Sequence, residues 1–95
     1  MKITVEFLSM PVVTKVIGAS SLALEFEGQT IEDLIKEVTG RYGEKVRQFL
    51  LDEAGKLDMI FKIILNKKEW IYREQMNKKL QPGDRVTIMM LAAGG

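Results

Sequence analysis

The sequence predicts a two-layer α+β domain in which a mixed sheet of four to five strands is covered by one main helix. Strand-like segments with alternating apolar residues open the chain, one segment of helical period follows, and strand-like segments then return. With 95 residues, of which 46% are hydrophobic and 28% charged, the chain can build one domain around one core.

The first two strands are expected at residues 2–8 and 21–27, where apolar and polar side chains alternate. Because the two segments are consecutive, they are expected to form a hairpin. The inward residues are Ile3, Val5 and Phe7 in the first strand and Leu22, Leu24 and Phe26 in the second.

The hairpin connection, residues 9–20, contains Pro11 and Gly18 and is expected to be a long loop. It is unusually apolar, with Met10, Val12, Val13, Val16 and Ile17. The preferred interpretation is that the loop folds over one end of the core, and the alternative is that it belongs to a docking surface.

The main helix is expected at residues 31–42, where the apolar positions change to helical spacing. Thr30 is a suitable N-cap, and Gly43 fits a left-handed position at the C-terminus. A weaker helical segment follows with Val46, Phe49 and Leu50, before a turn at residues 54–56. The apolar stripe consists of Ile31, Leu34, Ile35, Val38 and Tyr42.

The chain then returns to strand at residues 60–65, and residues 66–68 form a tight turn into a short segment, 69–72, that carries Trp70. Lys67 and Lys68 are expected to be solvated. Gln81-Pro82-Gly83-Asp84 is a turn signal, and the last strand follows at residues 85–90.

The predicted order is β-β-α-β-(β)-β, with the first and last strands paired at the centre of the sheet. This is the ubiquitin-like β-grasp arrangement. Residues 1–91 are expected to form the domain, and residues 92–95 a thin, flexible tail.

The tail, Ala92-Ala93-Gly94-Gly95, is the strongest candidate for a functional segment. Glycine has no Cβ, so a narrow cleft in a partner enzyme could reach the terminal carboxylate. Such a carboxylate is suited to being a reactant. The alternative is an ordinary frayed terminus.

Strand alternation predicts a second candidate surface on the sheet face away from the helix. If Val86, Ile88 and Met90 face inward, Thr87 and Met89 face outward. Ile64 likewise faces outward because Ile63 faces inward. The expected partner-binding residues are Ile64, Met89, Thr87 and Leu91. A register error of one residue would instead bury Ile64 and Met89.

Several function classes are disfavoured by composition. The chain has no Cys and no His, which removes disulfides, thiolate nucleophiles, Cys/His metal sites and the commonest general base, so an autonomous enzyme is not expected. A net charge of +1 does not favour nucleic acid or an anionic membrane. Without a recognisable signal peptide or a membrane-spanning segment, a cytoplasmic location is the default expectation.

The chain resembles the MoaD/ThiS family of sulfur-carrier proteins over almost its whole length. The resemblance lies in the opening strand, the start of the helix, the Ile64–Lys68 strand and turn, the Pro82–Val86 turn and strand, and the closing Ala93-Gly94-Gly95. The segment 52–57 resembles the longer members, which are the molybdopterin-synthase small subunits and the cysteine-synthesis carriers. The family usually has a proline shortly before Ala-Gly-Gly, where this chain has Met90-Leu91-Ala92.

The resemblance implies a carrier without a bound cofactor, whose catalytic groups belong to its partners. A MoeB/ThiF-like enzyme would use ATP to adenylate Gly95, and sulfur from a persulfide would give a thiocarboxylate. The acceptor would be a synthase such as a molybdopterin-synthase large subunit, in molybdopterin or tungstopterin formation. Cysteine or thiamine synthesis are the alternative pathways.

Two further hypotheses stay open. A ubiquitin-like modifier would use the same adenylated Gly95 to acylate a lysine, and it would be found isopeptide-linked to other proteins. A non-covalent β-grasp interaction module would keep its function after removal of Gly94 and Gly95.

Overall fold

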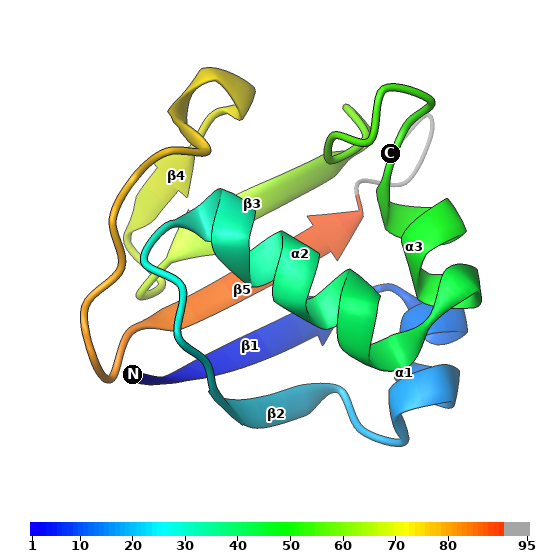
Figure 1. The fold of residues 1–95 in the computed structure, drawn as a ribbon, viewed down its shortest axis with the longest axis horizontal. Coiled ribbons are helices and arrows are strands. Elements are labelled where there is room, and N and C mark those ends of the chain that lie inside the picture. Colours follow the sequence, from blue (N-terminus) through cyan, green and yellow to red (C-terminus); the bar gives the residue numbers. More distant parts are fainter. Residues whose placement is uncertain (91–95) are drawn as a thin grey trace.

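The computed structural model describes residues 1–90, in which five strands form one mixed sheet in the order β2-β1-β5-β3-β4. The strands are β1 (Lys2–Leu8), β2 (Ser21–Glu25), β3 (Phe61–Leu65), β4 (Glu69–Ile71) and β5 (Arg85–Met90). β1 and β5 are parallel at the centre, and the other neighbours are antiparallel (Figure 1). The predicted ubiquitin-like β-grasp arrangement, with the last strand in the middle, is confirmed.

The second layer is helical. It contains α1 (Pro11–Ile17), α2 (Ile31–Tyr42) and α3 (Glu44–Leu50), and a short 3-10 helix, η1 (Arg73–Gln75), follows β4. α2 crosses one face of the sheet, α3 packs against α2, and α1 packs against α3 (Figure 1). Within residues 1–90, no helix is long and apolar enough to span a membrane.

The core lies between the sheet and the helices. The inward side chains of β1 and β5 are at most 1% exposed, as alternation predicts, except for Met90 at the end of β5, which is half-buried. Their partners on α2 and α3 are equally buried, so the apolar stripe of α2 faces the sheet. The largest fully buried side chains are Phe7, Ile3, Met10, Leu24, Ile31, Leu34, Leu50, Ile63, Ile88, Val5, Val13 and Val38.

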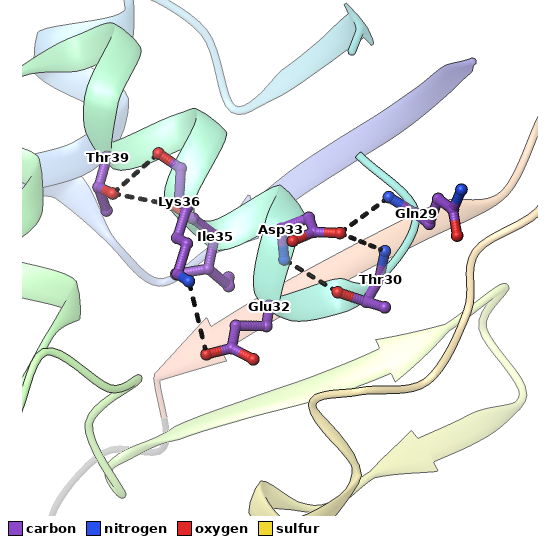
Figure 2. Close-up of polar contacts among 7 residues, drawn as sticks. All are labelled: Gln29, Thr30, Glu32, Asp33, Ile35, Lys36 and Thr39. Carbon is purple, nitrogen blue, oxygen red and sulfur yellow. Dashed lines mark hydrogen bonds and ion pairs between the residues drawn. The ribbon is translucent and has the colours of Figure 1, made fainter. Parts of the chain in front are cut away.

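α2 begins with a reciprocal cap. The Thr30 hydroxyl accepts a hydrogen bond from the Asp33 backbone N–H at 3.1 Å, and the Asp33 carboxylate accepts from the backbone N–H groups of Thr30 and Gln29 (Figure 2). These backbone donors hold the pKa of Asp33 below its ordinary value of 3.8. The predicted N-cap is confirmed, and the hydrogen bonds that the Asp33 carboxylate accepts complete the cap.

The connection between β1 and β2 is a helix and not a loop, so that part of the prediction is wrong. Pro11 starts α1, and Gly18, with φ 86° and ψ 8°, ends it in the left-handed conformation. Met10 and Val13 are buried in the core, whereas Val12 and Val16 are 42% and 39% exposed. The interpretation that this connection covers one end of the core is confirmed for the two buried residues.

Gly43 differs in detail from the prediction. Its φ of 88° is in the range that favours glycine, but its ψ of −170° is not that of a left-handed helical residue. Gly43 ends α2 and also precedes the first residue of α3. Val46 and Leu50 of α3 are fully buried, which confirms the weaker helical segment.

Two turns at the same end of the sheet are joined by Asn66. Asn66 and Lys67 have φ values of 55° and 62°, the pair of positive values that a type I′ turn requires between two strands. The Asn66 side chain donates to the Asp84 carboxylate at 3.0 Å and accepts from the Arg85 backbone N–H at 2.8 Å. These bonds fix the β3–β4 turn beside the start of β5.

Candidate functional site

The open face of the sheet is the side turned away from α2 (Figure 1). The register places Glu6 of β1 beside Thr87 of β5, and Thr87 in turn beside Ile64 of β3. Because side chains alternate along each strand, every second residue from these positions shares the open face. This face therefore carries Leu8, Met89, Lys62 and Trp70 as well.

Four apolar side chains form a patch on this face, which we call the open-face patch: Leu8, Ile64, Trp70 and Met89. Met89 lies opposite Leu8, and Ile64 lies opposite Trp70, so that Ile64 and Met89 are diagonal neighbours on adjacent strands. Leu8 is 37% and Trp70 49% exposed, while Ile64 and Met89 are half-buried. The structure thus brings Ile64 and Met89 together on the outer side, as alternation predicts.

Leu8 and Trp70 were missing from the predicted partner-binding residues. The sequence does contain a signal for Leu8, because strand alternation places this residue on the same outward face as Thr4 and Glu6 of the first strand. The signal for Trp70 required the register of β3 with β4, which depends on the positive φ values at the intervening turn.

Thr87 requires a correction. It faces away from α2, as predicted, but it is only 1% exposed and therefore is not available to a partner. Its hydroxyl donates to the Glu6 carboxylate at 3.0 Å. A polar residue that faces outward was expected to be accessible, but Thr87 lies between the longer side chains of Glu6, to which it donates, and Ile64 on the two neighbouring strands.

Glu6 is the centre of a charged cluster at this point of the sheet. Its carboxylate accepts from the Lys67 ammonium at 2.8 Å, and Arg85 lies 3.6 Å away. The hydrogen bond from Lys67, with smaller effects of Thr87 and Arg85, holds the pKa of Glu6 below its ordinary value of 4.5, although burial opposes the shift. Lys67 is therefore half of an ion pair and not only a solvated turn residue.

The Glu6 cluster should make stability depend on pH. Glu6→Gln keeps an acceptor for Thr87 but removes the charge, and it should lower the free energy of unfolding by about 1 kcal/mol at pH 7. Because the folded pKa is lowered, this contribution is complete above the unfolded pKa of about 4.5 and disappears as the pH falls through the folded pKa. Urea denaturation at pH 7, 5 and 3 measures the difference from wild type.

Glu53→Gln is the matched control, since Glu53 is exposed in the turn after α3 and should show no such difference. A gap between wild type and Glu6→Gln that stays constant down to pH 3 would contradict the assignment of the stabilisation to the ionised carboxylate.

The predicted tail, Ala92, Ala93, Gly94 and Gly95, lies outside the described residues, and so does Leu91. The structure does describe the strand that leads to them. β5 is paired with β1 on one side and with β3 on the other, up to the pairs of Met89 with Leu8 and Met90 with Phe61. The open-face patch therefore extends to the end of the strand from which residues 91–95 follow.

The described face combines apolar side chains with a charged cluster. Its apolar side chains can be desolvated by a partner, and its charged cluster can set orientation. Within residues 1–90, no group of three or more His, Cys, Asp or Glu side chains is placed to hold a metal ion.

No protein-family model matches the sequence, and no curated protein matches it. Solved structures do match. SAMP1 from Haloferax volcanii superimposes with a TM-score of 0.79 at 14% identity, over 100% of both chains. A putative molybdopterin converting factor, subunit 1, from Pyrococcus furiosus gives a TM-score of 0.69 at 19% identity, over 97% of this chain and 99% of that one.

A chain in the BexX/CysO complex of Amycolatopsis orientalis gives a TM-score of 0.71 at 25% identity, over 98% of this chain and 99% of that one. These similarities cover the whole domain and not only a shared motif. The resemblance to the MoaD/ThiS family is thereby confirmed at the level of the fold. The chain is a ubiquitin-like β-grasp protein, with the fold of an archaeal small modifier protein, a molybdopterin converting factor subunit and a chain of the BexX/CysO complex.

Proposed function

We propose that the protein is a cytoplasmic sulfur carrier whose reactive group is the carboxyl end at Gly95. The observation that supports this most is the position of β5. The strand that leads to Ala-Gly-Gly is the central one, held by both neighbours, and the open-face patch reaches its end. Such an arrangement suits a rigid body that a partner grips while it acts on the residues that follow.

The chemistry requires activation, because a carboxylate is a poor electrophile. Its oxygen attacks the α-phosphate of ATP, pyrophosphate leaves, and an acyl adenylate forms. A persulfide sulfur of the donor then displaces AMP to give an acyl disulfide. A second thiol attacks the donor's own sulfur in this acyl disulfide, which forms a disulfide between the two thiols and releases the thiocarboxylate of Gly95. We propose that a MoeB/ThiF-like partner supplies ATP binding and that all catalytic groups belong to the partners.

The acceptor we favour is a synthase that resembles the molybdopterin-synthase large subunit. The similarity to the Pyrococcus furiosus converting factor subunit supports this choice, as does the family resemblance of the segment 52–57. The structure with BexX and CysO in one complex supports the more general proposal that a carrier of this fold docks on a partner enzyme.

The direct test is mass spectrometry after incubation with ATP, a sulfide or persulfide source and the MoeB/ThiF-like enzyme of the same genome. The protein should gain the mass difference of one oxygen replaced by sulfur, and fragmentation should locate it at Gly95. An unchanged mass under conditions in which the enzyme turns over ATP with this protein would contradict the proposal.

A ubiquitin-like modifier is the second candidate, and the similarity to small archaeal modifier protein 1 over nearly the whole chain favours it. It would use the same adenylate, but a lysine amine would displace AMP. Isopeptide-linked forms that carry Gly95 on other proteins, with no thiocarboxylate, would favour this function.

The open-face patch should be needed for activation. Ile64→Asp and Met89→Asp should each weaken binding to the adenylating enzyme about tenfold or more, because each places a desolvated carboxylate in an apolar contact. Isothermal titration with the enzyme measures the dissociation constants.

Ala23→Asp is the matched control, since Ala23 lies opposite Thr4 and puts the same new charge on the same face, on the edge strand β2 away from the patch. Equal weakening by Ala23→Asp would show that charge in general, and not the open-face patch, reduces binding.

A further inference from the structure

A second candidate site lies on the helix side of the sheet, away from the open-face patch. A cavity of about 120 Å³, open to solvent on one side, is lined by α2, the segment that follows α3, and the residues around η1. Its floor is apolar. Ile35 and Leu57 are buried there, and Leu51 and Met76 are half-buried beside them.

The rim of this cavity is mostly cationic. Lys36, Lys56 and Arg73 line it together with one acid, Glu32. Lys36 and Glu32 extend from the same side of α2 (Figure 2), but their charged atoms are 3.9 Å apart and both side chains are exposed, so the pair is weak. Among residues 1–90, Lys56 has no ion-pair partner. Cations therefore exceed acids at the rim, by one even when Asp52, the partner of Arg73, is counted.

Asp52 holds this arrangement in place. It accepts from the Arg73 guanidinium at 2.7 Å and from the backbone N–H groups of Ala54 and Lys56 at 2.9 and 3.0 Å. These bonds keep the pKa of Asp52 below its ordinary value of 3.8, and the backbone hydrogen bond from Lys56 has the largest effect. They join two segments that are 21 residues apart. A guanidinium has five N–H donors, so this ion pair leaves donors for a ligand.

We propose that this cavity binds a small organic anion, a carboxylate with a compact apolar body. At about 120 Å³ the cavity is somewhat smaller than the apolar cavity of about 150 Å³ that accommodates benzene, so it limits the apolar body to about that size and leaves the carboxylate at the open side, among the cations. An inorganic anion would leave the apolar floor unused, and a neutral apolar molecule would leave the cations unused. The site neither includes the open-face patch nor requires a reaction at Gly95, so it is independent of the proposed carrier function.

Benzoate is a suitable probe, and the amide resonances of Ile35, Gly55 and Leu57 report on the cavity. Titration of ¹⁵N-labelled protein should shift these resonances saturably, with a dissociation constant in the millimolar range expected for a ligand of this size. Benzamide, which has the same body without the charge, and inorganic phosphate at equal ionic strength should each bind about tenfold more weakly. Equal binding of either one would overturn the proposal, as would shifts confined to the open face or no saturation at about 50 mM benzoate.

Paired variants test the role of the cations. Lys36→Gln with Lys56→Gln should weaken benzoate binding roughly two- to tenfold, the range for the loss of two exposed charge interactions. Lys45→Gln with Lys68→Gln removes the same charge from exposed positions outside the cavity and should leave the dissociation constant unchanged. Equal loss in both double variants would show that net charge alone attracts benzoate, and the assigned site would be wrong.

Discussion

Ile88→Asp is expected to leave the protein largely unfolded at room temperature. Ile88 is 0% exposed in the central strand, where it faces the helices from between β1 and β3. A carboxylate at this position would be buried without a partner, which costs several kcal/mol even if the group becomes protonated. Since domains of this size are stable by only about 5–15 kcal/mol, the loss is most or all of the folding free energy.

The neighbouring residue gives the matched control. Met89→Asp introduces the same group one residue later, on the half-buried open face, and should lower the free energy of unfolding by about 1 kcal/mol. Ile88→Val keeps the apolar character and should cost about 0.5–1.5 kcal/mol. Circular dichroism melts of the three variants decide the question. Severe unfolding of Met89→Asp together with tolerance of Ile88→Asp would mean that the two faces of β5 are assigned the wrong way round.

The strands could be predicted from the sequence because their physical signal is local. Ile3, Val5 and Phe7 alternate with polar residues, and a period of two leaves only one way to bury them. The α2 helix could be predicted from the sequence equally well, since its apolar stripe and its Thr30 cap lie within one segment. The central position of β5 followed from its apolar character together with the β-grasp order.

α1 could not be read from the apolar pattern. It has only seven residues, and Val12, Val13 and Val16 are β-branched, which lowers helix propensity. The local signal was Pro11 at the start with Gly18 just after the end, the usual asymmetry of helix termini. A loop was predicted because those two residues also occur at turns.

The burial of the Thr87 side chain depends on contacts between distant residues, which no local sequence pattern contains. Glu6 precedes Thr87 by 81 residues and Lys67 by 61, and only the folded sheet brings them together. Alternation gives the side on which a residue lies, whereas its exposure depends on the length of the side chains beside it. The cavity next to α2 could not be predicted from the sequence either, because the Asp52–Arg73 ion pair beside it joins distant segments.

Removal of Gly95 is expected to abolish sulfur loading while the domain remains folded. The truncated chain still ends in a carboxylate, so the prediction concerns its position and not its chemical type. A partner that grips the open-face patch fixes the end of β5, and each residue of extended chain beyond it spans about 3.3–3.6 Å. Shortening by one residue thus withdraws the carboxylate by about this distance, and a misplacement of about 1 Å can already cost a hundredfold in rate.

A chain extended by one tryptophan after Gly95 should fail as well, because its carboxylate is displaced in the other direction and a large side chain must enter the cleft. Both variants should melt like wild type, since the sheet and the core are formed within residues 1–90. Intact-mass measurement after incubation with ATP, the sulfur source and the adenylating enzyme gives the thiocarboxylate fraction of each protein. Equal loading of the truncated and the full-length chain would place the chemistry elsewhere and refute the role of Gly95.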